Sequence, residues 1–328
     1  MFKRILFFSL IVTIVLFTTQ TIYSWGFFGH KRINRMAVFT LPTDMIGFYK
    51  KHIEFITEHA VDPDKRRYAN KLEAPRHYID IDHYGKNWDT IVPRYWKQAV
   101  NKFTEDTLQA YGIVPWHIEK MLQRLTDAFK KEDLDQILHY SADIGHYIAD
   151  AHVPLHTTEN YNGQLTNQKG IHGFWESRLP ELTADDFDYF VGKAKYVEKP
   201  NESAWDFVRV SNSAVDSVLQ FEAMLNESFP ADRKYGYENR GASLMKTYSK
   251  EYSLEYNKLM NGMVERRMRA AIIMVGSFWY TAWVNAGQPD LSRLENKEVT
   301  DSLKKVMNEE ELLWKTGKLA GSGKGHDD

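Results

Sequence analysis

Apolar residues recur at spacings of three and four along almost the whole chain, and this constrains the fold more than any other feature. The pattern is regular in residues 118–125, 134–142 and 208–219, and it returns in residues 244–283. Such spacings place side chains on one face of an α-helix. No run of alternating apolar and polar residues bounded by hairpin turns is evident, so no β-hairpin is predicted. We therefore predict the all-α fold class, with a single mainly helical domain at residues 25–316.

The first 24 residues form a predicted secretory signal. A basic pair precedes the apolar run 5–17 and polar residues follow it, which is the order of a cleavable export signal. The run is too short to span a bilayer comfortably. Cleavage after Ser24 makes Trp25 the first residue of the mature protein and predicts a periplasmic or extracellular location. The alternative is that residues 1–24 stay attached as a membrane anchor.

Two further segments bear on the organisation of the chain. Residues 270–286 are almost entirely apolar, and their aromatic side chains suit a helix buried in an all-α core. A membrane span is the alternative, although the segment is slightly short for one. We expect no stable membrane span once the signal is removed. Residues 317–328 are rich in glycine and are predicted to form a flexible tail.

The chain contains no cysteine and twelve histidines, and its formal net charge is -2. The lack of cysteine excludes disulfides, thiolate zinc sites, iron–sulfur clusters and a cysteine nucleophile. The nearly balanced charge is not that of a polybasic coat for nucleic acid, and loss of the signal makes the chain more acidic. A metal site in this chain must therefore be built from His, Asp, Glu and backbone groups.

The densest group of candidate ligands lies in residues 145–156. His146 and Asp150 are four residues apart on a periodic helix, so their side chains project from one face about one turn apart. That geometry lets an imidazole and a carboxylate share one cation. Pro154 ends the helix, which leaves His156 free to turn back toward the same place.

Other segments repeat or extend this pattern. His172 and Glu176 have the same four-residue separation, and His77 lies among carboxylates farther upstream. At the predicted mature N-terminus, the α-amino group and carbonyl of Trp25 can chelate a cation, with His30 as a third ligand. A single pair of this kind is common on helix surfaces, but several pairs together favour a metal centre.

At these residues the sequence resembles a known family. The motifs, in order, are a processed N-terminal Trp25 with His30, then His77-Tyr-Ile-Asp80, then His146-x3-Asp150-x-His-x-Pro-Leu-His156, and then His172-x2-Trp-Glu176. The pattern is similar to that of the superfamily that joins bacterial zinc-dependent phospholipases C to the single-strand-specific zinc nucleases of fungi and plants. The motifs occupy the N-terminal half of the mature chain, and the C-terminal half matches only in helical character.

The resemblance implies a helical domain with a cleft that holds three zinc ions. It implies one zinc bound by Asp62, His77, His146 and Asp150, a neighbouring zinc bound by His156, His172 and Glu176, and a third bound by Trp25 and His30. Asp150 would bridge two of the ions. Asp62 is the predicted ligand, rather than Asp64, because its fifteen-residue separation from His77 fits the spacing in the nucleases.

The activity implied by the resemblance is hydrolysis of phosphate esters. Two zinc ions about 3.5–4 Å apart can bridge a hydroxide and lower its pKa toward about 7, which supplies a nucleophile without serine or cysteine. Asp62 is predicted to orient or deprotonate the attacking water. Lys65 and Arg66, or Arg67, are predicted to stabilise the negative transition state. The alternative for these cations is a solvated surface.

Two branches of the superfamily remain open. The short interval from Trp25 to His30 favours the nucleases, and Tyr78 and Asp80 match positions that stack on a base and hydrogen-bond its edge there. Glu176 favours the phospholipases, because the nucleases usually carry Asp at that position. The short interval that precedes His172 also resembles the phospholipase branch.

We therefore predict a secreted zinc-dependent phosphoesterase that acts as a single-strand nuclease or 3'-nucleotidase. Its predicted substrates are single-stranded nucleic acid and nucleotides. The alternative is a phospholipase C that cleaves phospholipid head groups. A third hypothesis, from a different class, is a metal-binding protein without catalytic activity.

Overall fold

The structure is a computed structural model, and it describes residues 26–240, 243–317 and 320. The predicted signal segment, Trp25 and most of the predicted tail lie outside the described residues. Of the N-terminal ligand pair predicted from the sequence, Trp25 and His30, only His30 therefore lies within the described residues.

Helices make up most of the described chain, which confirms the predicted all-α fold class. The α-helices are α1 (Gly26–Ala37), α2 (Thr43–Lys51), α3 (Ile53–Glu58), α4 (Asp62–Arg66), α5 (Trp88–Ile91), α6 (Trp96–Phe103), α7 (Glu105–Tyr111), α8 (Val114–Lys130), α9 (Leu134–Ala151), α10 (Ile171–Gly173), α11 (Leu179–Thr183), α12 (Pro200–Asn212), α13 (Val215–Ser228), α14 (Lys250–Leu259), α15 (Met263–Asn285) and α16 (Asp301–Lys315). Short turns of 3-10 helix connect them: η1 (Val38–Thr40), η2 (His59–Val61), η3 (Ala74–Arg76), η4 (Ile81–Tyr84), η5 (Pro154–Thr157), η7 (Ala184–Asp186) and η8 (Ala231–Arg233). The remaining turn, η6 (Phe174–Arg178), is a π-helix.

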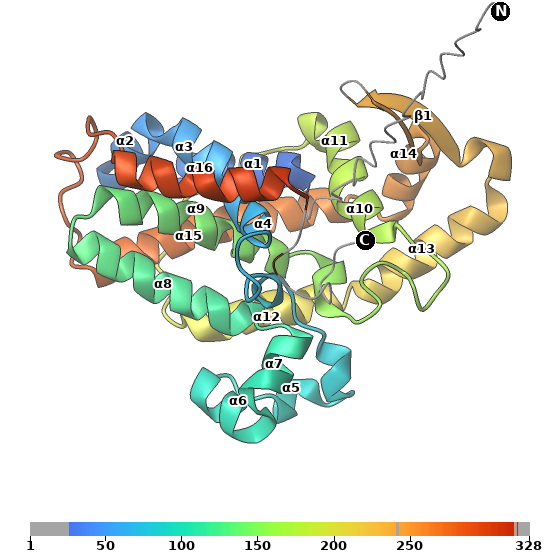
Figure 1. Ribbon diagram of the computed structural model, residues 1–328. Helices are drawn as coiled ribbons and strands as arrows, with labels where there is room; N and C mark the ends of the chain where they lie inside the picture. Colours follow the sequence, from blue (N-terminus) through green and yellow to red (C-terminus); the bar gives the residue numbers. More distant parts are fainter. Residues whose placement is uncertain (1–25, 241–242, 318–319, 321–328) are drawn as a thin grey trace, which may run out of the picture.

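The centre of the molecule is formed by α8, α9 and α15, with α1 and α12 packed against them (Figure 1). The apolar segment predicted as a core helix lies on α15, where Phe278 and Trp279 are fully buried. Burial of each such side chain stabilises the fold by about 1.5–3 kcal/mol. The indole N–H of Trp279 donates to the carbonyl of Ser141 in α9 at 2.9 Å, so its polar atom is satisfied inside the core. Within the described chain, no helix combines the length and apolar character needed to cross a bilayer.

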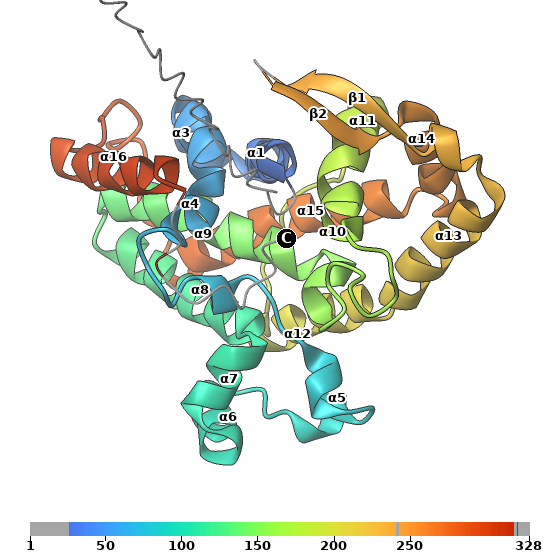
Figure 2. The same ribbon diagram turned by 45° about the vertical axis from the view of Figure 1, so that its right-hand side comes forward.

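The prediction that the chain forms no β-hairpin is wrong. Strands β1 (Tyr235–Arg240) and β2 (Ser243–Tyr248) form a two-stranded antiparallel sheet in which Tyr235 pairs with Tyr248. β1 has tyrosine and glycine at alternating positions followed by polar residues, so it lacks the apolar face that marks a strand. The hairpin lies beside α11 and α14 (Figure 2).

The C-terminal helix α16 packs against α4 (Figure 2). The Nζ atom of Lys65 in α4 lies 2.9 Å from Oε2 of Glu311 in α16. The ring of Phe27 in α1 also contacts that of Trp314, with centroids 5.6 Å apart. These contacts hold α4 in place, and α4 carries several residues of the site.

Candidate metal centre

One pair of predicted ligands lies on the buried face of α9. His146 and Asp150 are one turn apart, and Nε2 of His146 lies 3.2 Å from Oδ2 of Asp150. The helix begins at a capped N-terminus, where the side chain of Asp133 accepts a hydrogen bond from the backbone N–H of Gln136 at 3.1 Å. Both ligand side chains are fully buried. The arrangement is that expected from the four-residue spacing.

A glycine allows α1 to approach α9 closely enough to add His30. A Cβ built on Gly145 would lie 2.0 Å from Oδ1 of Asn34 in α1, so no larger residue fits at this crossing. Asn34 in turn donates to a backbone carbonyl of α9 at 3.1 Å. The imidazole of His30 stacks on that of His146, with ring centroids 3.8 Å apart and planes at 17°. Its Nε2 lies 3.4 Å from Oδ1 of Asp150.

Backbone hydrogen bonds orient two of the imidazoles. Nδ1 of His146 lies 2.8 Å from the carbonyl oxygen of Ala60, and Nδ1 of His156 lies 2.7 Å from that of His77. A ring nitrogen that donates to a carbonyl carries the proton, which leaves the lone pair of Nε2 for a cation. In both residues Nε2 faces a carboxylate of the cluster.

His77 completes the first ligand group. Its Nδ1 lies 3.0 Å from Oδ2 of Asp150 and 3.0 Å from Nε2 of His146. Oδ1 of Asp64 is 3.7 Å from each of these two imidazole nitrogens. The donor atoms of His77, His146 and Asp150 lie within 4.8 Å of one another, and so do those of His30, Asp64 and His146.

The structure brings Asp64, and not Asp62, to this cluster. Both residues lie on α4, where each position advances about 100° around the helix axis, so their side chains leave it in different directions. Asp62 accepts a hydrogen bond from Nδ1 of His59 at 2.6 Å and lies 3.4 Å from Nζ of Lys65. The geometry therefore favours Asp64 as the ligand, although the interval to His77 had pointed to Asp62.

The second ligand group joins η5 to the turn formed by α10 and η6. Oε2 of Glu176 lies 3.0 Å from Nε2 of His172 and 3.3 Å from Nε2 of His156. Glu176 itself lies in the π-helical turn η6, which is wider than the α-helix that the spacing suggested, and such turns are frequent at functional sites. Burial opposes ionisation of Glu176, but the two imidazoles outweigh it and lower its pKa to about 2.

Burial and neighbouring charges set the protonation of the first group. Burial lowers the pKa of His30 and of His77, which favours the neutral imidazole that binds metals. Burial also opposes ionisation of His146, but the carboxylates of Asp150 and Asp64 outweigh it and raise its pKa to about 9. For Asp64 itself burial is the largest influence, and it raises the pKa of the carboxyl group.

The donor set fits zinc. Neither carboxylate oxygen of Asp64 accepts a hydrogen bond from any residue that the structure describes, although both are buried. A buried carboxylate without a donor is unfavourable, and a bound cation relieves that cost. Imidazole nitrogens and carboxylate oxygens are the ligands of catalytic zinc sites. The residues present therefore fit a cluster of zinc ions.

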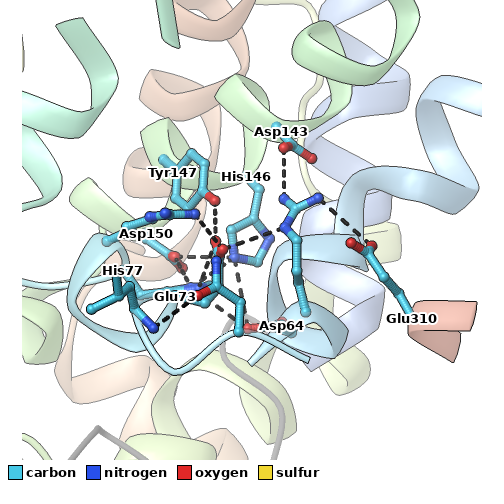
Figure 3. Close-up of polar contacts among 12 residues, drawn as sticks. Asp64, Glu73, His77, Asp143, His146, Tyr147, Asp150 and Glu310 are labelled. Atoms are coloured by element: carbon cyan, nitrogen blue, oxygen red, sulfur yellow. Dashed lines mark hydrogen bonds and ion pairs between the residues drawn. The ribbon is translucent and has the colours of Figure 1, made fainter. Parts of the chain in front are cut away.

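Behind these ligands lies a buried network centred on Glu73 (Figure 3). The fully buried carboxylate of Glu73 accepts hydrogen bonds from the hydroxyl of Tyr147 and the guanidinium of Arg76. Its Oε1 lies 3.9 Å from Nε2 of His77, on the side of the ring away from the cluster. Carboxylates behind metal-binding imidazoles fix the ring orientation and make the imidazole a better ligand.

Arg66 joins this network to two helices. Its Nε donates to Oε2 of Glu73 at 3.3 Å, and its Nη2 donates to Oδ2 of Asp143 in α9 at 2.6 Å. A third carboxylate, Glu310 of α16, lies 3.8 Å from its Nη1 (Figure 3). Among the residues that the structure describes, Arg66 contacts Glu73 rather than any of the predicted ligands. Its geometry is that of a positioning residue.

The other two basic residues that follow Asp64, Lys65 and Arg67, interact with different parts of the molecule. Lys65 turns toward α16, where it pairs with Glu311 and lies 5.6 Å over the ring of Trp314. Arg67 acts on the ligands instead. Burial raises the pKa of Asp64, and the positive charge of Arg67 opposes that rise. Burial lowers the pKa of His77, and the charge of Arg67 lowers it further. Of the three cations proposed from the sequence, Arg67 is the one whose charge acts on the pKa values of Asp64 and His77.

We expect the substitution Arg66→Met to lower the free energy of unfolding by about 3–5 kcal/mol, because it removes the largely buried guanidinium that pairs with both Glu73 and Asp143. Urea unfolding of the zinc-saturated protein measures the change. The matched control is Arg293→Met, which removes an exposed ion pair with Glu132 and should cost no more than about 1 kcal/mol. Equal losses in the two variants would contradict the structural role of Arg66.

The two predicted substrate-binding residues follow His77 directly in the chain. Tyr78 and Asp80 are both buried, with relative exposures of 3% and 9%. Burial, together with the carboxylates of Asp82 and Glu159, raises the pKa of Asp80 to about 8. Near neutral pH its carboxyl group can therefore donate a hydrogen bond as well as accept one.

Glu73, Asp143 and Tyr147, which lie behind the ligands, are not among the residues predicted from the sequence. Glu73 comes from the irregular segment before η3, where no periodicity indicates which side chains turn inward. Asp143 and Tyr147 had a weak signal, since they lie on the same helix as His146 and within one turn of it. Only the packing of α4, α9 and η3 shows that these residues meet.

Comparison with known proteins shows the family of the chain. A family model described as S1/P1 Nuclease matches residues 25–273, which include all the predicted ligands and the network around Glu73. No curated protein sequence matches the chain. The helix α16 lies beyond the matched region. The matched residues make up well over half of the chain, which therefore belongs to the S1/P1 nuclease family and is a zinc-dependent hydrolase of phosphoric ester bonds.

Proposed function

We propose that the protein is an exported single-strand nuclease with 3'-nucleotidase activity and three zinc ions. The observation that carries this proposal is the convergence of imidazoles on one carboxylate. Oxygens of Asp150 lie within 3.4 Å of nitrogens of His30, His77 and His146. A carboxylate in that position can link separate ligand groups into one multi-zinc centre.

The geometry of the described residues supports the proposed ligand groups, with Asp64 in place of Asp62, and Trp25 is added from the sequence alone. One zinc ion would be held by Asp64, His77, His146 and Asp150, a second by His156, His172 and Glu176, and a third by His30 with the amino terminus of Trp25. Asp150 would be shared. Zinc bound there would supply a water nucleophile at neutral pH and neutralise negative charge on the phosphate.

The side chains around the cluster would position the substrate. Arg67 would donate hydrogen bonds to a non-bridging phosphate oxygen, since a guanidinium matches that geometry and its charge already acts on Asp64 and His77. The carboxylate of Glu73 would face the ring of His77 from behind, 3.9 Å from its Nε2, and favour a cation on the other side of the ring. In place of the general roles predicted for Lys65 and Arg66, we propose that these two residues fix the position of α4.

The base of the nucleotide would bind at Tyr78 and Asp80, where the ring of Tyr78, which is 3% exposed, would have to be uncovered before a base stacks on it. Base stacking on an aromatic ring contributes roughly 1–3 kcal/mol per base. A carboxyl group with a pKa of about 8 can exchange hydrogen bonds with both donors and acceptors on a base edge. Membership of a nuclease family supports nucleic acid as the substrate class over phospholipid.

Export rests on the N-terminal sequence, and the start of the family match supports it. The match begins at Trp25, the residue that signal cleavage would make the first of the mature chain. A free amino group at Trp25 would then be available next to His30. N-terminal sequencing of the protein isolated from its native source tests this step, and a sequence that begins at Met1 would contradict it.

The substrate class is tested by three assays on the zinc-loaded protein. We expect hydrolysis of single-stranded DNA and RNA and release of phosphate from a 3'-nucleotide, with little action on phosphatidylcholine. Hydrolysis of phosphatidylcholine without nuclease activity would favour the phospholipase alternative. Zinc binding without any hydrolysis would favour the non-catalytic hypothesis.

A further inference from the structure

The β-hairpin combines positive charge with tyrosine on a chain whose overall charge is nearly balanced. Residues 235–248 contain Arg240, Lys246, three tyrosines and one acidic residue, Glu238, and Lys234 directly precedes them, whereas the whole chain has a formal net charge of -2. Surfaces that bind single-stranded nucleic acid combine cations along the backbone with aromatic rings on which bases stack. The composition of the hairpin therefore suits a polyanion with planar bases.

One face of the hairpin presents these side chains to solvent. In the antiparallel register Tyr237 pairs with Lys246, and Asn239 pairs with Leu244, so all four lie on the face that also carries Tyr235. Tyr237 is 70% exposed and Leu244 is 65% exposed. Large apolar and aromatic side chains exposed side by side indicate a binding surface.

The charge of Lys246 is available to a ligand. Its Nζ lies 4.3 Å over the ring of Tyr235, and within the part of the chain that the structure describes it forms no ion pair. Lys234, at the base of the hairpin, differs because its Nζ lies 2.9 Å from Oε1 of the buried Glu222. A cation held over an aromatic ring and not neutralised by a carboxylate is suited to bind a phosphate beside a stacked base.

The opposite face of the hairpin, through Glu238, and its base, through Tyr248, are fixed to the turn that carries Glu176. The guanidinium of Arg178, in η6, forms two hydrogen bonds with the carboxylate of Glu238. The ring of Phe174, in the same turn, stacks on that of Tyr248 with centroids 3.8 Å apart and planes at 13°. These contacts tie the hairpin to the metal centre.

The aromatic contacts continue from this turn to the exposed face. The ring centroid of Tyr248 lies 5.0 Å from that of Tyr235, which in turn lies under Lys246. Tyr237 follows two positions later on the same face. A series of rings thus leads from Phe174, two residues before Glu176, to the outer surface of the hairpin.

We propose that this outer face, formed by Tyr235, Tyr237, Leu244 and Lys246, is a subsite that binds single-stranded nucleic acid outside the metal centre. Bases stack on the tyrosine rings and against Leu244, and Lys246 binds a phosphate. The inference rests on the proposed nuclease function and adds to it a preference for long single strands over short ones. A membrane surface fits less well, because Leu244 is the only aliphatic side chain among these four residues.

The test compares the double variant Tyr237→Ala/Lys246→Gln with the unmodified protein, both loaded with zinc. The substrates are a deoxyadenylate strand of about 20 nucleotides, longer than the roughly 4–16 nucleotides that single-strand sites cover, and the dinucleotide d(ApA). We expect KM for the long strand to rise about fivefold or more, the effect of losing one stacked base, while kcat and the hydrolysis of d(ApA) stay unchanged. The single change Lys246→Gln should also reduce the slope of log affinity against log salt by about 0.7.

The matched control, Tyr95→Ala/Lys258→Gln, removes an exposed tyrosine and an exposed lysine elsewhere and should leave both substrates unaffected. Unchanged KM for the long strand in the hairpin variant would overturn the subsite. An equal loss of activity on the long strand and on d(ApA) would also overturn the subsite, because the substitutions would then act on the metal centre through Glu176. Lost binding to phosphatidylglycerol vesicles with unchanged KM would assign the face to a membrane instead. If the unmodified protein hydrolyses neither substrate, the proposed function fails, which is a different result.

Discussion

Replacement of Asp150 by asparagine is expected to reduce kcat/KM on single-stranded DNA by about a thousandfold or more, equivalent to about 4 kcal/mol of transition-state stabilisation. Oxygens of Asp150 lie 3.0 Å and 3.2 Å from nitrogens of His77 and His146, and 3.4 Å and 3.8 Å from nitrogens of His30 and His156. Asparagine keeps the size of the side chain but loses the charge that all four imidazoles face. The zinc content per chain should fall together with the rate.

The measurement needs a control for folding and for the substitution itself. Asp127→Asn makes the same chemical change at an exposed position on α8 and should leave zinc content and activity unchanged. Circular dichroism should show the same helical content in both variants. Full zinc content and full activity in Asp150→Asn would contradict its position as the shared ligand.

The second prediction with a large expected effect compares Asp64 with Asp62, which lie two positions apart on α4. We expect Asp64→Asn to reduce kcat/KM by more than about a hundredfold, because even partners behind a metal ligand are worth about 10- to 100-fold. The same change at Asp62 should have an effect of threefold or less, since that side chain pairs with His59 and Lys65 on the other side of α4. The two variants have identical chemistry, so each serves as the control of the other.

Zinc analysis decides what a loss of activity in either variant means. In Asp64→Asn the bound zinc should decrease, and in Asp62→Asn it should not. A large loss of both zinc and activity in Asp62→Asn, with little change in Asp64→Asn, would restore the ligand predicted from the spacing to His77 and contradict the geometry of α4.

Most of the helical core and most of the candidate ligands could be predicted from the sequence, because both depend on the spacing of residues close together in the chain. The helical period marks most of the core, and a four-residue separation is enough to place His146 beside Asp150 on one face. The order of the motifs supplied the rest of the ligand set through its resemblance to a known family. Contacts between residues close in the chain are those that a periodic pattern can specify.

The parts that could not be predicted depend on how segments pack. A fixed interval from His77 cannot distinguish Asp62 from Asp64, because the choice depends on the rotation of the short helix α4 against α9 and α16. The network around Glu73 joins side chains far apart in the chain. The hairpin was missed because its exposed face is aromatic and polar, so the strands show no buried alternation.

Zinc reconstitution tests most directly whether this cluster is a catalytic zinc centre. The mature protein is stripped with a chelator and titrated with zinc, and bound metal and hydrolysis of single-stranded DNA are measured at each step. We predict no hydrolysis by the stripped protein, recovery of activity on addition of zinc, and three ions bound per chain at saturation. Hydrolysis that survives complete removal of the metal, or fewer than two zinc ions bound at full activity, would contradict the assignment of this cluster as a zinc centre.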